Sequence, residues 1–581
     1  MGQSICYRCV RRRVLWGIIS HERYHKAVKS IFKSTNLQKN SLAIATVLFF
    51  GLVSPSLTLG QASSAITNPI QRSGMTPLLG VGEDGDLSLG AERSMGDAIA
   101  KQIYRDPDYL DDPLLNEYVD GIWQSLLKAA RARGELTVEM DERFAWRVML
   151  ARDRTVNAFA LPGGYFGVHL GLIGLVANQD ELASVLAHEL THVTQRHIAR
   201  SITQQGRQTP VMIAAMILGA VAARNNPDAL NAVISGSQAV AIQGQLNFSR
   251  DMEREADRLG LGLMQPAGFA PQGFVGMFEK LQQSARLSDS GNFPYLRSHP
   301  MTTERMGDMQ QRLLIQQHTG QHMAKLAPQT EPSLQHAMMS ARARVLAEPG
   351  IDVLRLWAAE PQASGFANLS KSRQVGSLYA AILANIKLRD FVRATAQKDR
   401  LKITVTGDLY AYLATKLIAI ELHLSANNAE AALTLLPIQA AGRRLSRPEL
   451  FAQSQVQIAS QQVAQQPVLA ASAAQNLQTW VATNPSDAPA WQLLGNAYRA
   501  TGQNLRAVRA EAEAQVALLD YAAALDRFKA AQDMVRNGSL STNTGQNTGR
   551  DYMEESIIDV RTRQVRGLLK QQIKDEKEAD K

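Results

Sequence analysis

The feature that most constrains the fold of this chain is the pentapeptide HELTH at residues 188–192, which lies within a mainly apolar run. Such a run predicts a helix, on which His188 and His192 stand about 40° apart around the axis and face one point. Two neutral imidazoles at this spacing form half of a tetrahedral zinc site. Glu189 comes round beside the metal, where its carboxylate can take a proton from a zinc-bound water. The alternative is a helix with incidental histidines.

A zinc site of this kind needs a third protein ligand. His197 lies nine residues after His188, so on a continuous helix it points about 180° away and should be a packed or surface histidine. Glu253 and Asp257 lie four residues apart on one face of a second predicted helix, whereas Glu255 is a rival ligand on another face. Glu253 could complete a His2Glu set, with water in the fourth position. Asp257, which we group with the catalytic residues, would hold a ligand imidazole in the right tautomer.

The N-terminal segment 1–62 predicts a cleaved export signal. Residues 1–40 contain nine Lys or Arg and one acidic residue, and an apolar run follows at 42–53. This run of about 12 residues is shorter than the roughly 20 that a membrane-spanning helix needs. The small-residue tripeptide ending at Ala62 is typical of a cleavage site. An uncleaved membrane anchor is the alternative.

The signal also accounts for the charge and the cysteines of the chain. Without its first 40 residues, the net charge falls from +9 to about +1, so the remaining protein is not basic and we expect no nucleic-acid partner. Both cysteines, Cys6 and Cys9, lie within the signal. A mature chain would contain no cysteine, so any metal site must use His and carboxylate ligands.

A chain of 581 residues is too long for one hydrophobic core and should divide into domains. Residues 63–90 are rich in Ser, Gly, Pro and Thr, which predicts a flexible leader. A mixture of helix and strand follows at 91–317, then a linker at 318–333. Residues 334–536 are almost wholly helical, and 537–581 form a further linker and a charged C-terminal helix.

The helical half contains one well-marked repeat. Trp491, Leu494, Gly495 and Tyr498 have the spacing of a tetratricopeptide helix, and alanines follow at the small-residue positions of a partner helix. Gly and Ala let two helices approach closely, while the aromatic residues fill the groove between neighbouring pairs. Repeats before residue 480 are degenerate, and a generic helical bundle is the alternative.

Residues 211–223 form another apolar run, of about 13 residues. The run is too short to span a bilayer, so we expect a buried helix or hairpin. A shallow peripheral membrane contact, or a flap over the active site, is the alternative.

Three segments, 156–173, 181–200 and 248–260, closely resemble the gluzincin metallopeptidase family that includes the CAAX-prenyl and heat-shock membrane proteases. The export signal and the repeats narrow the resemblance to exported members of that family. The resemblance extends from about Gly90 to the end of the chain, but it is weaker in the repeats. The resemblance implies an α+β zincin-like (minigluzincin) domain followed by an all-α tetratricopeptide-like domain.

The resemblance also implies roles for single residues. His188, His192 and Glu253 would hold one Zn²⁺ per chain, and Glu189 would be the catalytic base. His299, within Ser-His-Pro, matches a histidine that in relatives can occupy the open metal position, so it is a candidate regulatory ligand. An edge strand would pair with the extended substrate; its residues are Asn157, Ala158, Phe159 and Ala160.

The implied function is that of a periplasmic zinc metalloendopeptidase acting on misfolded or stalled envelope proteins. Its expected partners are unfolded outer-membrane proteins and the outer-membrane barrel assembly machinery, bound through the repeats. The alternative is a chaperone-like outer-membrane assembly factor in which binding dominates and proteolysis is secondary. A permanently membrane-embedded protease is disfavoured, because no mature segment reaches spanning length.

Overall fold

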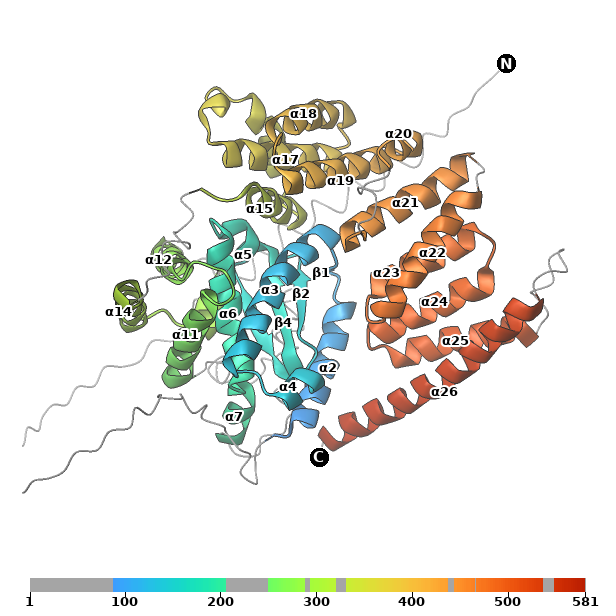
Figure 1. The fold of residues 1–581 in the computed structure, drawn as a ribbon, viewed down its shortest axis with the longest axis horizontal. Helices are drawn as coiled ribbons and strands as arrows, with labels where there is room; N and C mark the ends of the chain where they lie inside the picture. The colour runs from blue at the N-terminus through green and yellow to red at the C-terminus, as the bar shows by residue number, and fades with distance from the viewer. Residues whose placement is uncertain are drawn as a thin grey trace, which may run out of the picture. The chain divides into compact units, whose positions relative to one another are not determined.

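The computed structural model describes seven ranges of the chain (Figure 1), namely 87–204, 249–287, 293–319, 331–436, 444–464, 467–536 and 548–579. All of them belong to one structural unit, Thr76–Lys581. The predicted export signal and the apolar run at 211–223 lie outside the described residues. Within the described ranges, no helix combines the length and the apolar character that crossing a bilayer requires.

A mixed sheet of four strands lies in the first half of the described chain, in the order β1-β2-β4-β3. The strands are β1 (Tyr109–Leu110), β2 (Arg147–Ala151), β3 (Ala158–Leu161) and β4 (Tyr165–His169). β2 and β4 are parallel, whereas β1–β2 and β3–β4 are antiparallel. β3 therefore forms one edge of the described sheet, and the expected mixture of helix and strand is present here.

The pairing of β3 with β4 fixes which backbone groups face the open edge. The amide of His169 donates to the carbonyl of Asn157, which makes these two residues a hydrogen-bonded pair. Hydrogen-bonded and non-hydrogen-bonded pairs alternate along an antiparallel ladder, so the backbone groups of Ala158 and Ala160 point away from β4. Phe159 covers Gly167, where an added Cβ would lie 2.1 Å from the ring.

The helix α6 (Gln179–Thr194) is central to this half, and its residues 180–194 are all buried. Its start is capped, because the Asn178 side chain accepts a hydrogen bond from the amide of Glu181 at 3.0 Å. α6 packs against α11 (Arg250–Met264) so closely that a Cβ on Gly260 would lie 3.2 Å from the Ala187 carbonyl.

The other helices of this half pack around α6, the sheet and one another. They are α2 (Leu89–Arg105), α3 (Pro113–Arg133), α4 (Val138–Arg143), the 3-10 turn η1 (Pro162–Gly164), α5 (Leu170–Leu175), α7 (His197–Gln204), α12 (Gln272–Leu287), α13 (Tyr295–Ser298) and α14 (Thr303–Thr319).

The rest of the described chain is helical. Its helices are α15 (Leu334–Leu346), α16 (Ile351–Ala359), α17 (Lys371–Lys387), α18 (Phe391–Thr404), α19 (Leu409–Ser425), α20 (Ala429–Leu433), α21 (Arg447–Ala464), α22 (Pro467–Thr483), α23 (Ala488–Ala500), α24 (Asn504–Ala517), α25 (Tyr521–Arg536) and α26 (Thr548–Ala579). On α23, Trp491, Leu494 and Tyr498 are buried in one cluster with alanines of α24. This packing is compatible with a tetratricopeptide repeat, and that assignment stays a prediction.

The first helices of the second half share a hydrophobic core with the sheet and α6. One cluster of buried residues runs from Leu114 to Val456. A buried ion pair joins Arg342 of α15 to Asp112, the N-cap of α3, at 2.6 Å. His336 of α15 lies 2.7 Å from the Tyr118 hydroxyl. α15 is thus part of the packing that supports α3.

Candidate metal centre

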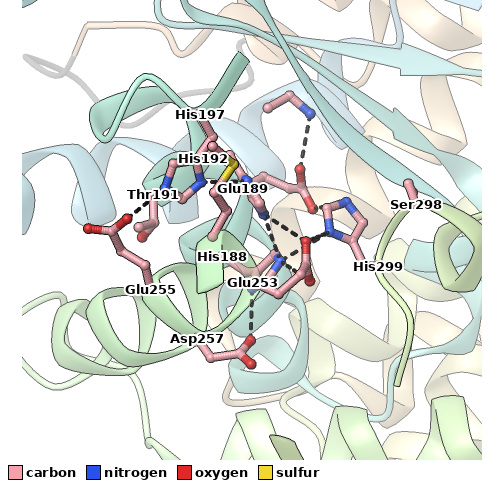
Figure 2. Close-up of polar contacts among 12 residues, drawn as sticks. His188, Glu189, Thr191, His192, His197, Glu253, Glu255, Asp257, Ser298 and His299 are labelled. Atoms are coloured by element: carbon pink, nitrogen blue, oxygen red, sulfur yellow. Dashed lines mark hydrogen bonds and ion pairs between the residues drawn. The ribbon is translucent and has the colours of Figure 1, made fainter. Parts of the chain in front are cut away.

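Four buried side chains converge on one point, as Figure 2 shows: His188, His192, Glu253 and His299. α6 carries the first two, α11 carries Glu253, and His299 directly follows α13. Each is at most 2% exposed. The structure therefore brings together the three predicted zinc ligands and the predicted regulatory histidine.

The distances within this group suit a tetrahedral metal ion. His188 Nε2 lies 3.0 Å from His192 Nε2 and 3.2 Å from His299 Nδ1. Glu253 Oε1 lies 2.9 Å from His299 Nδ1 and 3.5 Å from His192 Nε2. With metal–ligand bonds of about 2.0–2.2 Å, the ligand atoms of a tetrahedral zinc site are about 3.3–3.6 Å apart, so a small outward shift of the closest atoms would accommodate the ion. Three imidazole nitrogens and one carboxylate oxygen thus fit a divalent ion.

Glu189 lies beside this group and in contact with the edge strand. The amide of Ala160, on the open side of β3, donates to Glu189 Oε2 at 3.0 Å. The other oxygen, Oε1, lies 3.4 Å from His299 Nε2 and accepts no hydrogen bond from the described residues. Burial raises the pKa of Glu189, although His299 and His188 oppose the rise. A raised pKa suits a carboxylate that must accept and return a proton.

His188 is supported by the predicted carboxylate. Its Nδ1 lies 3.0 Å from Asp257 Oδ1. Burial lowers the pKa of His188, but contacts with Asp257 and Glu253 outweigh this effect and raise it to about 9 in the metal-free protein. A metal must therefore displace a proton from this imidazole.

Arg305 is a residue of the site that sequence reasoning missed. Its guanidinium donates to both oxygens of Asp257, at 2.6 and 2.7 Å, and lies 2.8 Å from Glu253 Oε2. It also donates to the carbonyl of Pro300 at 2.9 Å. Arg305 thus contacts three parts of the site. They are Asp257, which supports His188, the candidate ligand Glu253, and Pro300 in the loop of His299. It follows Asp257 by 48 residues, so no local spacing indicates the contact.

The expectation for His197 needs a correction. α6 ends at Thr194, Arg196 has a φ of +52°, and α7 begins at His197, so the helix does not continue as the nine-residue arithmetic assumed. His197 is buried, and its Nδ1 lies 2.9 Å from His192 Nδ1. His197 is thus a packed histidine, as expected. It lies behind the candidate ligand His192 and does not point away from the site. Glu255, the rival ligand, lies 3.0 Å from His197 Nε2 instead of in the metal group.

The predicted substrate strand takes the position that pairing would need. Ala158, Phe159 and Ala160 lie in β3, Asn157 directly precedes it, and β3 is an edge of the described sheet. The strand reaches the centre through the contact between Ala160 and Glu189. Its pairing with a substrate stays a prediction.

A buried cluster of His and Glu on two helices, with a second glutamate at hydrogen-bond distance from an edge strand, defines a class of protein: a metallopeptidase. Comparison with known families bears this out, since residues 113–313 match the model described as peptidase family M48. The matched segment contains every residue of the centre and is similar to this family, so the predicted gluzincin resemblance is confirmed.

The names of individual relatives are also those of proteases. A putative beta-barrel assembly-enhancing protease of Vibrio cholerae is 34% identical over 55% of this chain and 61% of its own length. The beta-barrel assembly-enhancing protease of Escherichia coli is 28% identical over 84% of this chain and 92% of its own. The mitochondrial metalloendopeptidase OMA1 of Saccharomyces cerevisiae is 28% identical over 38% of this chain and 64% of its own. The match to the Vibrio protein thus spans about three fifths of that relative.

Proposed function

We propose that this chain is an exported zinc metalloendopeptidase that hydrolyses peptide bonds of misfolded or stalled envelope proteins. The observation that carries the proposal is the convergence of His188, His192 and Glu253 beside a buried Glu189 that contacts the edge strand. The names of the Vibrio and Escherichia relatives support an envelope role, and the absence of cysteine beyond residue 9 suits a His2Glu zinc site.

The residues of the centre divide the chemistry between them. The two α6 histidines and Glu253 would hold zinc, which would supply polarisation of the scissile carbonyl and a lowered pKa of an attacking water. Glu189 accepts the proton of that water at its buried carboxylate and delivers it to the leaving amine. Asp257, anchored by Arg305, keeps His188 oriented with Nε2 towards the other ligands.

The edge strand orients the peptide. An extended substrate pairs antiparallel or parallel with the backbone groups of Ala158 and Ala160 that point away from β4. Because the Ala160 amide now donates to Glu189, substrate pairing takes this donor away from the carboxylate and leaves Glu189 free to bind the water. Strand pairing and release of the base are therefore one event.

His299 keeps the centre closed at rest. Its ring fills the fourth corner of the group, and it packs on Tyr295 with ring centroids 4.6 Å apart. Water and substrate would reach a bound metal only after His299 left, which would require movement of the loop that Arg305 contacts at Pro300. His299 is thus a regulatory ligand.

The predicted N-terminal signal and the names of the relatives support the proposed cellular setting. The chain is exported to the periplasm, where its clients are unfolded outer-membrane proteins and its docking partner is the outer-membrane barrel assembly machinery. The helical domain that follows residue 334 supplies the binding surface. A peripheral membrane contact through 211–223 is part of this proposal.

Glu189→Gln tests the proposal directly. The variant should retain one Zn²⁺ per chain but lose hydrolysis of an unfolded β-barrel protein by about 10²–10⁴-fold, because the base is gone while the ligands stay. Zinc content and cleavage are measured together for the wild type, Glu189→Gln and His299→Ala. The His299→Ala variant should cleave faster than the wild type.

His188→Ala is the matched control, since it should lose zinc and cleavage together. Substantial cleavage by Glu189→Gln would overturn the role of the base. Unchanged cleavage in His299→Ala would overturn the regulatory role.

A chaperone-like assembly factor is the second candidate function. The closed, fully buried centre favours it, because such a site suits a protein whose main output is binding. Full rescue of a deletion strain by Glu189→Gln would favour this function over proteolysis.

A further inference from the structure

The candidate ligand His192 has a second histidine directly behind it. His192 Nε2 faces the metal group, whereas its other ring nitrogen, Nδ1, lies 2.9 Å from His197 Nδ1 (Figure 2). His197 Nε2 in turn lies 3.0 Å from Glu255 Oε2, which also accepts from Arg200 at 3.0 Å. Both histidines are completely buried.

From this chain of contacts we infer that His197 is a positioning residue, which holds metal ligand His192 in the tautomer that can bind zinc. The inference rests on the proposed zinc-peptidase function. It goes beyond that function, because His197 lies behind His192 and is not one of the four converging side chains.

The direction of the hydrogen bonds follows from chemistry. Glu255 is a carboxylate paired with an arginine, so it only accepts hydrogen bonds, and the proton of His197 must lie on Nε2. The Nδ1 of a neutral His197 is then an acceptor. It accepts the Nδ1 proton of His192, which leaves the Nε2 lone pair of His192 free for the metal.

The backbone break at the end of α6 is what places His197 there. Arg196 adopts a left-handed φ of +52°, which is uncommon for a residue with a side chain. Its guanidinium lies 3.2 Å from the buried Glu92 of α2 and donates to the Leu87 carbonyl. These contacts stabilise the break, which returns His197 to the back of His192.

The test compares three substitutions of His197 by Zn²⁺ affinity, measured on the full chain by competition with a chelator. His197→Phe keeps the ring but removes both hydrogen bonds, and it should weaken Zn²⁺ binding by about 10–100-fold. His197→Asn places an acceptor where Nδ1 was and should restore most of the affinity. His197→Gln reaches towards Glu255 but leaves His192 without its acceptor, so it should bind less tightly than Asn.

His336→Phe is the matched control, because His336 is also buried and makes two ring contacts, to Tyr118 and to the Val176 carbonyl. It should leave Zn²⁺ affinity unchanged. Equal affinities of His197→Phe and wild type, or of the Asn and Gln variants, would overturn the inference even if the Phe variant folds poorly. A wild type without Zn²⁺ binding would instead overturn the proposed function.

Discussion

The two histidines of α6 differ in what lies behind them. His188 contacts a carboxylate directly, Asp257 at 3.0 Å, and that carboxylate is bound by Arg305. His192 reaches a carboxylate only through His197, and that carboxylate is bound by Arg200. Both series of contacts thus end in an arginine, but the series behind His192 contains one more side chain, His197.

The two supports also differ in their exposure to water. The side chain of Arg305 is 5% exposed, whereas that of Arg200 is 43% exposed. Buried charges depend strongly on their partners, and exposed pairs contribute little. The contacts behind His188 should therefore be rigid, and their loss should lower the stability of the protein strongly. The contacts behind His192 should tolerate substitution of Arg200.

Arg305→Met should give the largest effect. It would remove the guanidinium that pairs with the buried carboxylates of Asp257 and Glu253, which destabilises the metal-free protein by about 3–5 kcal/mol. Urea-induced unfolding of the metal-free protein measures this loss. Arg200→Met is the control, with an expected loss of at most about 1 kcal/mol. If the two arginine variants were equally stable, the contrast between buried and exposed support would be wrong.

Asp257→Asn and Glu255→Gln should separate the direct support from the indirect one. Asp257→Asn weakens the orientation of His188 itself, so Zn²⁺ affinity should fall by about 10–100-fold. Glu255→Gln leaves His197 between the change and His192, so its loss should be smaller. Chelator competition measures both variants. A larger loss for Glu255→Gln would reverse the comparison and make the imidazole link the critical one.

Two pairs of residues in the centre were predicted from helical spacing, whereas His299 was predicted only from the family resemblance. His188 and His192, and likewise Glu253 and Asp257, lie four residues apart, so each pair shares a helical face. That rule needs no knowledge of tertiary structure. The rule selected three candidate ligands and one supporting carboxylate, and the structure brings these four side chains together.

The spacing rule failed where the helix ended. Nothing in the sequence around Arg196 signals a left-handed residue, since glycine is the usual marker of that conformation and none is present there. His197 was therefore placed on the wrong side. Arg305 was missed for a different reason, because its contact with Asp257 is made between two helices and no rule of local spacing applies.

A third pairing of imidazole and carboxylate, away from the metal group, gives a reference for both supports. His169 Nδ1 lies 3.0 Å from Asp153 Oδ2, and Asp153 also accepts from the amide of Thr155 at 2.8 Å. The contacts anchor the loop that leads into β3. Burial raises the pKa of Asp153, but hydrogen bonds from His169 and Thr155 outweigh it and hold this pKa well below its usual range.

Asp153→Asn should therefore cost about 1 kcal/mol of stability at pH 7 and leave Zn²⁺ affinity unchanged, because no metal ligand depends on it. A depressed carboxyl pKa contributes stability that is complete above the unfolded value of about 3.9 and is lost as pH falls towards the folded value. The stability difference between wild type and Asp153→Asn should thus shrink as pH falls from about 5 to 3 in urea unfolding. A gap that widened over that range, or a fall in Zn²⁺ affinity, would show that this pair acts on the centre as the other two do.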